Sequence, residues 1–349
     1  MCVRPSKGAD TLGPMANTSR TARPSRSMTV LPDARLSPRF AGIPTFCRYP
    51  RIEDVKGTGG GGGGVDWAIY GVPFDGGTTY RPGARFGPRA IRIESQYVKR
   101  YSIEQDVDVC ETLSIADAGD APVAPYDCAK NAKLQTAFAA GLGTKKTKLM
   151  AIGGDHTIAY GNLRATWERR GKPKGGLPLV HFDSHLDTVD AVWGEKWGHA
   201  SVFRRAIEDG LVNPKKMISV GVKGPLNSKD DLAYARRKGV RVLTYSDLAA
   251  GADAELEAFV EERGKEPTYI SFDIDCVDPA YAPGTGTPSV GGLTSSEALS
   301  LLRMLRGLTI AGADIVEVLP DRDIGGITAL LAGHVMFEIL ALDAAARQV

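Results

Sequence analysis

The chain has 349 residues, of which 43% are hydrophobic and 24% charged, a globular composition that suits one large α/β domain or two smaller ones. The net charge of +2 is too small to favour nucleic acid as a partner, and no apolar stretch approaches the roughly 20 residues that cross a membrane. Five scattered cysteines without a CxxC pair favour free thiols in a reducing compartment, which we expect to be the cytoplasm.

Residues 1–28 are rich in Ser, Thr, Arg and Pro and contain one acid, Asp10. This composition predicts a disordered tail or, alternatively, an organelle transit peptide that would make the protein mitochondrial. Residues 29–64 are predicted to be an N-terminal extension that ends in the flexible linker GTGGGGGG. Within it, residues 38–50 carry large apolar side chains that we expect to pack against the domain or a neighbouring subunit: Phe40, Ile43, Phe46 and Tyr49.

Residues 65–349 are predicted to form one domain, because short apolar runs alternate with segments of helical pattern. Seven runs predict buried strands: DWAIYGV, KLMAIGG, LPLVHFD, KMISVGV, VRVLTY, TYISFDID and LTIAGADIVEV. Helices are predicted at residues 87–97, 157–170, 200–209, 230–238, 252–263, 294–305 and 326–344. This alternation predicts an α/β fold with a parallel sheet and helices on both faces.

Imidazole and carboxylate side chains follow four of the predicted strands. Sites in open parallel sheets form beyond the carboxyl ends of the strands, so we expect these side chains to meet at one edge. They are His156, Asp183, His185, Asp187, Asp273, Asp275 and Glu317. Asp155, beside them in the chain, is expected instead to cap the helix that starts near Thr157.

The four aspartates of this set need a compensating charge, because buried carboxylates repel one another and lose hydration. No Lys or Arg lies within the segments DSHLD and DID, so a basic cluster is a poor partner. Mixed His and Asp donors without a thiolate favour Mn²⁺ and also allow Ni²⁺ or Zn²⁺. The joint pattern predicts a site for two divalent ions, with six ligands: His156, Asp183, His185, Asp187, Asp273 and Asp275.

Several blocks resemble the signatures of the ureohydrolase family of arginases, agmatinases and guanidinobutyrases. They are GGDHTIAYGN, HFDSHLDT, SFDIDCVDPAYAPGTGTPSVGGLT and DIVEVLP, and YGVPFDGGTTYRPGARFGPRAIR resembles agmatinase-type members. The resemblance covers about residues 38–345. It implies a three-layer α/β/α sandwich of the arginase/deacetylase type, with about eight parallel strands, in homo-trimers or homo-hexamers.

The resemblance also implies roles for individual residues. Asp183 and Asp273 would bridge two Mn²⁺ ions, with His156 and Asp187 completing one ligand set and His185 and Asp275 the other. His181 is expected to be a neighbour at the strand end rather than a ligand.

The expected reaction is hydrolysis of a guanidino compound to urea and an amine, by water that the two ions activate. Glu317 would pair with the cationic guanidinium, and His199, in the segment GHASVFRRA, would relay a proton to the departing amine. The ligand Asp187 completes the expected catalytic residues.

The resemblance favours agmatine as substrate, although the residues leave the tail of the substrate open. In the loop 188–198, Trp193 and Trp197 suggest an apolar wall or, equally, packing anchors; Asp190 or Glu195 would meet an amine, and Lys196 would meet a carboxylate. The charged run DRD at residues 321–323 departs from agmatinases and keeps guanidinobutyrate, guanidinopropionate and free guanidine as alternatives.

Two rival functions fit the sequence less well. A metal-dependent amide deacetylase of related fold would bind a single zinc and would not need His156, Asp187 and Asp275. A non-catalytic regulatory subunit would be expected to have lost ligands, and none is lost here.

Overall fold

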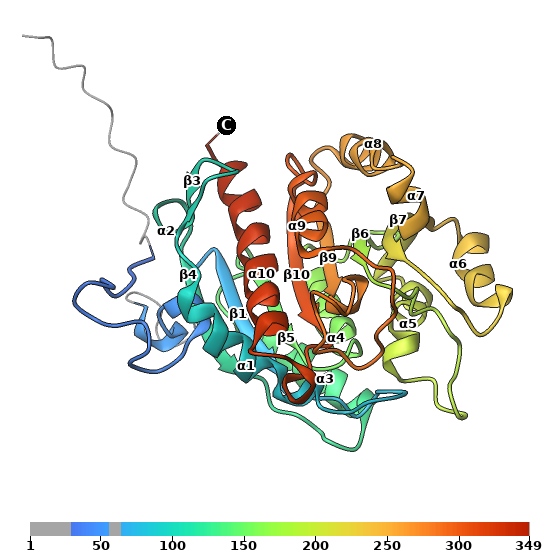
Figure 1. The fold of residues 1–349 in the computed structure, drawn as a ribbon, viewed down its shortest axis with the longest axis horizontal. Helices are drawn as coiled ribbons and strands as arrows, with labels where there is room; N and C mark the ends of the chain where they lie inside the picture. Colours follow the sequence, from blue (N-terminus) through green and yellow to red (C-terminus); the bar gives the residue numbers. More distant parts are fainter. Residues whose placement is uncertain (1–28, 56–63, 349) are drawn as a thin grey trace, which may run out of the picture.

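A sheet of eight parallel strands forms the centre of the computed structural model, which describes residues 29–55 and 64–348 (Figure 1). The strands are β1 (Trp67–Val72), β4 (Ile115–Asp120), β5 (Lys148–Gly153), β6 (Leu177–Phe182), β7 (Val212–Val222), β8 (Arg241–Thr244), β9 (Thr268–Asp273) and β10 (Ile310–Val316). Their order across the sheet is β4-β1-β5-β10-β9-β6-β7-β8. The four middle strands are β5, β10, β9 and β6. The order of the strands along the chain reverses among them, and a site is expected at the carboxyl ends of the strands at such a point.

Helices cover both faces of the sheet, so the predicted three-layer α/β/α sandwich is confirmed (Figure 1). One face packs against α1 (Gly87–Glu94), α7 (Tyr245–Ala249), α8 (Ala254–Arg263), α9 (Ser295–Arg303) and α10 (Ile327–Ala345). The other packs against α3 (Cys128–Gly141), α4 (Ile158–Arg169), α5 (Val202–Glu208) and α6 (Ala233–Lys238). Burial on both faces explains why β1, β6, β9 and β10 are buried along their whole length.

The longest elements that the sequence prediction missed are the edge strand β4 and the helix α3. Strand β4 has the sequence IADAGD, in which small and acidic residues dilute the apolar pattern. Its acids are satisfied by tertiary contacts, because Arg92 forms ion pairs with Asp117 and Asp120. Helix α3 is rich in Ala and has almost no amphipathic pattern. The short strands β2 (Tyr101–Ser102) and β3 (Val107–Asp108) and the helix α2 (Val109–Thr112) were also not predicted.

Helix α10 is the longest helix of the described residues, and it alone among them is long and apolar enough to span a membrane by length and composition. It corrects the sequence-based statement that no apolar stretch approaches that length. Most of α10 is buried inside the protein, where it packs against β10, α1 and α9. The helix is therefore apolar on all sides because it forms the centre of one helical layer.

The N-terminal extension contributes two aromatic residues to the core. Phe46 and Tyr49 are fully buried in the same apolar cluster as β1 and α1, and the Phe46 amide donates to Asp117. Phe40 and Ile43 do not pack on their own domain, since 94% and 73% of their surfaces are exposed. The predictions for residues 1–28 and for the glycine run at 56–63 lie outside the described residues.

We predict that removal of residues 1–28 leaves the thermal midpoint and the size-exclusion profile unchanged, whereas removal of residues 1–50 lowers the midpoint and the soluble yield. Only the longer deletion takes Phe46 and Tyr49 out of the core, and each large aromatic lost there costs about 3–5 kcal/mol of unfolding free energy. Phe46→Ala and the exposed Phe40→Ala form a matched pair for thermal unfolding. Equal midpoints for this pair would contradict the assignment of Phe46 to the core.

Candidate metal centre

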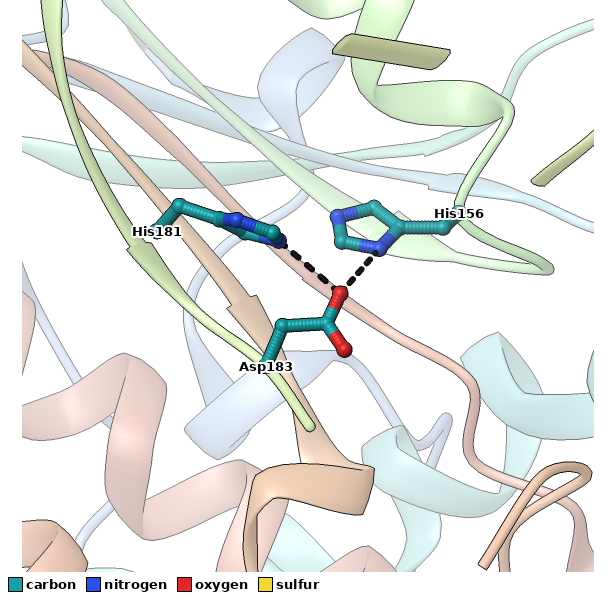
Figure 2. A group of neighbouring side chains, drawn as sticks. All are labelled: His156, His181 and Asp183. Atoms are coloured by element: carbon teal, nitrogen blue, oxygen red, sulfur yellow. Dashed lines mark hydrogen bonds and ion pairs between the residues drawn. The ribbon is translucent and has the colours of Figure 1, made fainter. Parts of the chain in front are cut away.

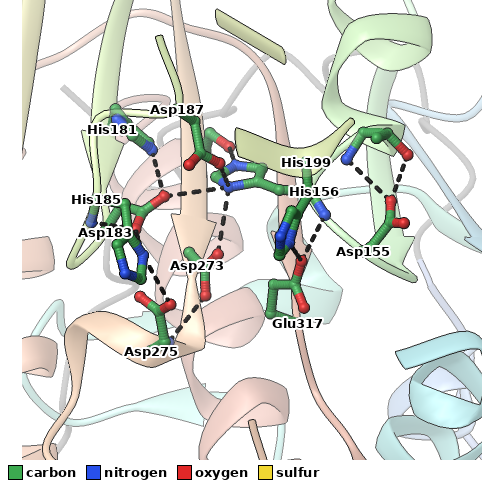
Figure 3. Close-up of polar contacts among 12 residues, drawn as sticks. Asp155, His156, His181, Asp183, His185, Asp187, His199, Asp273, Asp275 and Glu317 are labelled. Atoms are coloured by element: carbon green, nitrogen blue, oxygen red, sulfur yellow. Dashed lines mark hydrogen bonds and ion pairs between the residues drawn. The ribbon is translucent and has the colours of Figure 1, made fainter. Parts of the chain in front are cut away.

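The six predicted metal ligands converge at the carboxyl edge of the four middle strands (Figure 3). His156 follows β5, Asp183 follows β6, and Asp273 is the last residue of β9. Asp275 lies in the 3₁₀ turn Ile274–Cys276, whose first amide groups are capped by the Asp273 carboxylate. Because neighbouring parallel strands end at the same edge, residues more than 100 positions apart in the chain become neighbours.

The first group gathers around Nδ1 of His156. This atom lies 3.2 Å from Asp183 Oδ2, 2.9 Å from Asp187 Oδ2 and 3.2 Å from Asp273 Oδ2. It is buried and has no hydrogen-bond partner within the described part of the chain. An octahedral ion with bonds of about 2.1 Å places neighbouring donors about 3 Å apart, and the three distances from His156 Nδ1 match this spacing.

The second group joins Asp183 to His185 and Asp275. Nδ1 of His185 lies 3.3 Å from Asp183 Oδ1 and 3.1 Å from Asp275 Oδ2. The two oxygens of Asp183 thus face different groups, which is the arrangement of a carboxylate that bridges two ions. Asp273 takes part only in the first group, because its other oxygen accepts the Asp275 amide at 2.9 Å.

His181, expected to be only a neighbour of the ligands, is fully buried and lies in contact with the ligand Asp183. Its Nε2 is 2.8 Å from Asp183 Oδ2 (Figure 2). Its Nδ1 is 3.2 Å from Ser219 Oγ. The rings of His181 and His156 both pack against Phe203. His181, His156 and Asp183 together have donor atoms close enough to hold an ion, but His181 is also placed to orient the Asp183 carboxylate.

Electrostatics at the centre favour bound cations. Burial and the neighbouring Asp275 and Asp183 raise the pKa of Asp273 well above its ordinary value. Burial opposes a charged imidazole at His156, but the carboxylates around it outweigh this and raise the pKa of His156. A divalent ion would supply the positive charge that the histidine otherwise supplies by taking up a proton.

Glu317 and His199 form a pair beside the first group. His199 Nδ1 is 2.8 Å from Glu317 Oε1, which also accepts the His156 amide at 2.9 Å. Burial disfavours a charged His199, but the Glu317 carboxylate prevails and raises the pKa of His199 to about 9. The other oxygen of Glu317, Oε2, is buried and has no hydrogen-bond partner among the described residues. Glu317 therefore retains an acceptor for a cationic ligand.

The backbone at Asp187 and Glu317 is held in the left-handed region, with φ of 50° and 66°. Residues with a Cβ rarely adopt this conformation, which costs of the order of 1–3 kcal/mol and concentrates at functional sites.

Asp155, predicted to cap α4, accepts the amide of Thr157 at 3.0 Å and that of Gly77 at 2.7 Å. It thereby ties the start of this helix to the loop that contains Thr79.

A cavity of about 270 Å³ opens onto the centre. Its inner end is lined by His185, Asp187, His199, Asp273 and Thr79. Its outer end is lined by Thr188, Val189, Val222, Pro225, Leu226, Asn227, Asp231 and Leu232. No Lys or Arg of the described ranges lines it, and Asp231 is the only charged residue at the outer end.

The loop 188–198 contributes less to this cavity than predicted. Asp190 forms ion pairs with Arg204 and Arg205, and Glu195 lines a separate cavity together with Trp193 and Trp197. The charged run 321–323 does not line the cavity either, because Asp323 accepts amides from the start of α10. Asp190, Glu195, Trp193 and Trp197 therefore do not line this cavity, and their roles toward the substrate tail stay predictions.

Thr79 and Asp231 are among the cavity residues that sequence reasoning missed. The Thr79 amide donates to His199 Nε2 at 2.9 Å, and its hydroxyl lies 2.7 Å from the same nitrogen. Thr79 lies in the segment YGVPFDGGTTYRPGARFG, whose resemblance to agmatinase-type members could have indicated a residue of the site. Asp231 lies in a run of polar residues, SKDD, that carries no local signal for a site.

Comparisons with known proteins agree with this geometry. Residues 65–342 match the model of the arginase family. Guanidinopropionase from Pseudomonas aeruginosa is 42% identical, over 90% of this chain and 96% of its own, and mitochondrial agmatinase from Gallus gallus is 37% identical, over 94% and 93%.

Solved structures give the same result. Proclavaminate amidinohydrolase from Streptomyces clavuligerus superposes with a TM-score of 0.80 at 39% identity, covering 89% of this chain and all of that one. Formiminoglutamase from Trypanosoma cruzi, solved with two Mn²⁺, shares the fold with a TM-score of 0.73 at 23% identity, covering 84% and 98%. The chain belongs to the arginase family.

Proposed function

We propose that this arginase-family hydrolase cleaves agmatine to urea and the corresponding diamine, with two Mn²⁺ ions per chain. The observation that carries the proposal is the pair of His and Asp groups that share Asp183 at the inner end of the cavity. The family implies a binuclear metal centre, and the donors fit one: oxygen and imidazole ligands without thiolate suit Mn²⁺, and Ni²⁺ is the second choice. When bound, the two ions would lower the pKa of a water and make it nucleophilic near neutral pH.

The residues of the chain have distinct tasks in this proposal. His156, Asp183, Asp187 and Asp273 hold one ion, and His185 and Asp275 hold the other with the shared Asp183; the bridging role of Asp273 rests on the resemblance. Glu317 accepts the guanidinium through its free Oε2 and orients its carbon toward the ions. His199, next to Glu317 and Thr79, moves a proton to the departing amine.

Asp231 supports an amine at the far end of the substrate. Its Oδ2 accepts the amides of Asn227 at 3.0 Å and Ser228 at 3.2 Å, which fixes the side chain at the outer end of the cavity. No ion pair occupies Asp231 within the described residues, and its second oxygen remains available. A cationic amine would supply the missing charge, whereas a carboxylate would be repelled.

A guanidino acid is the second candidate, and a different observation favours it. The guanidinopropionase is 42% identical to this chain, against 37% for the agmatinase. A substrate with a carboxylate tail would need a cation from outside the described lining of the cavity.

Because the exposed Phe40 and Ile43 are available for subunit contact, we also propose a homo-trimer or homo-hexamer, in which a neighbouring chain would lie near these residues.

The direct test is urea release from a panel of guanidino compounds after loading with Mn²⁺, and separately with Ni²⁺. Agmatine is expected to give the highest kcat/KM, followed by compounds with neutral tails, with guanidinobutyrate and guanidinopropionate lower. A preference for the two acids would replace agmatine by the second candidate. Failure to release urea from any member of the panel by fully loaded protein would contradict the proposed reaction itself.

Asp231→Asn is predicted to lower kcat/KM for agmatine about 10- to 100-fold and to leave a neutral-tailed substrate nearly unchanged. A hydrogen bond to a charged group contributes about 1.5–3 kcal/mol, and asparagine keeps the acceptor for the Asn227 amide while removing the charge. Asp230→Asn is the matched control, because Asp230 is exposed in the same turn and does not line the cavity. Equal losses for agmatine and the neutral-tailed substrate would remove Asp231 from tail recognition.

Asp183→Asn is predicted to abolish turnover more completely than His199→Ala. Asp183 touches both donor groups, so its loss should leave fewer than two tightly bound ions per chain. His199→Ala should keep both ions and lose only proton transfer, which is typically worth about 10²–10⁴-fold in rate. Metal analysis of each variant, followed by urea release, makes the comparison; equal residual rates in fully metallated variants would refute the ranking.

A further inference from the structure

A row of buried polar side chains crosses the middle of the sheet directly below the metal ligands. Asp314 of β10 is in register with Ser271 of β9, Ser271 with His181 of β6, and His181 with Ser219 of β7. Ser271 lies two residues before Asp273, and His181 lies two residues before Asp183, so each points to the same face as its ligand. All four residues of the row are buried.

The hydrogen bonds of Ser271 determine which nitrogen of His156 carries a proton. The Ser271 hydroxyl donates its single proton to Asp314 Oδ1 at 2.6 Å. Its oxygen, 2.9 Å from His156 Nε2, must therefore accept from that nitrogen. With the proton on Nε2, the neutral ring has a free lone pair on Nδ1, the atom that faces Asp183, Asp187 and Asp273.

A second chain of hydrogen bonds also ends on Asp314. Tyr269 donates its hydroxyl proton to Asp314 Oδ2 at 2.5 Å and accepts from Asn162 at 2.6 Å. Asn162 accepts the Tyr70 hydroxyl at 2.9 Å. Tyr269 and Ser271 thus donate to the two oxygens of Asp314, which accepts at both.

The charge of Asp314 has no basic partner among the described side chains: no Lys or Arg forms an ion pair with it. An unpaired buried carboxylate costs several kcal/mol after relaxation, and a cation nearby would reduce this cost. The hydrogen bonds through Ser271 connect Asp314 to the His156 ring, whose Nδ1 faces the predicted metal ligands. In many metal sites a carboxylate accepts a hydrogen bond from the ligating histidine and orients its ring. Here Ser271 lies between the carboxylate of Asp314 and the ring of His156.

We propose that Asp314 and Ser271 are positioning residues for the metal ion at His156. They hold the imidazole in the tautomer and orientation that present Nδ1 to the ion, while His181 and Ser219 at the same level support Asp183. The inference rests on the metal centre of the proposed function and is independent of the substrate. Binding of Mn²⁺ therefore tests it even if no guanidino compound is hydrolysed.

The test measures Mn²⁺ binding to the full-length chain by competition with a chelator, without substrate. Ser271→Ala and Asp314→Asn are expected to weaken the binding of one of the two ions about 10- to 100-fold, the usual cost of losing such a partner, and to leave the other ion nearly unchanged. Ser271→Thr keeps the hydroxyl and should restore most of the affinity. If Asp314→Asn does not fold, the comparison of Ser271→Ala with Ser271→Thr decides the question alone.

Tyr70→Phe is the matched control. Tyr70 is fully buried in the same network, but four hydrogen bonds separate it from Ser271. Its loss should lower the thermal midpoint without changing either Mn²⁺ affinity. Wild-type affinity for both ions in Ser271→Ala, or an equal loss in Tyr70→Phe, would overturn the assignment and leave the network a purely structural role.

Discussion

The mutual repulsion of five buried carboxylates at one edge of the sheet is the constraint on which the rest of the site depends. At an effective dielectric constant of 20, two such charges 4 Å apart repel by about 4 kcal/mol. Backbone amides donate hydrogen bonds to three of these carboxylates: Ser184 to Asp275, His185 to Asp183, and His156 to Glu317. These bonds fix the carboxylates but cannot neutralise them, so the preformed geometry and the demand for cations arise from the same residues.

The metal ligands were predictable because their signal is local. In HFDSHLDT and SFDID, the ligand residues stand at or directly after the end of a buried strand, and strand ends of a parallel sheet meet at one edge. The pattern therefore indicates both the type of metal ligand and its place at the carboxyl edge of the sheet. The same logic failed for β4, where acids that pair with Arg92 interrupt the apolar run, and for α3, whose alanine-rich surface has little periodicity.

Residues defined by contact between distant elements were not predictable in this way. Thr79 and His199 are 120 positions apart and meet only after folding. The role of Asp314 depends on its register with Ser271, which no single segment encodes. In the loop 188–198, the two tryptophans suggested a pocket wall and the two acids a partner for an amine, but Trp197 packs on Tyr160 and Asp190 pairs with arginines. Such residue types serve packing as readily as recognition.

The division of the cavity into two ends has an evolutionary consequence. The inner end comes from the end of β9, the residues that follow β6, and the segments that contain Thr79 and His199, whereas much of the outer end comes from the segment that follows β7, from Pro225 to Leu232. Mutations can accumulate in that segment without disturbing a ligand or the buried row beneath it. A single scaffold can therefore exchange substrates through a short surface loop while its reactive centre is inherited unchanged, and a new specificity needs only a few substitutions at tolerant positions.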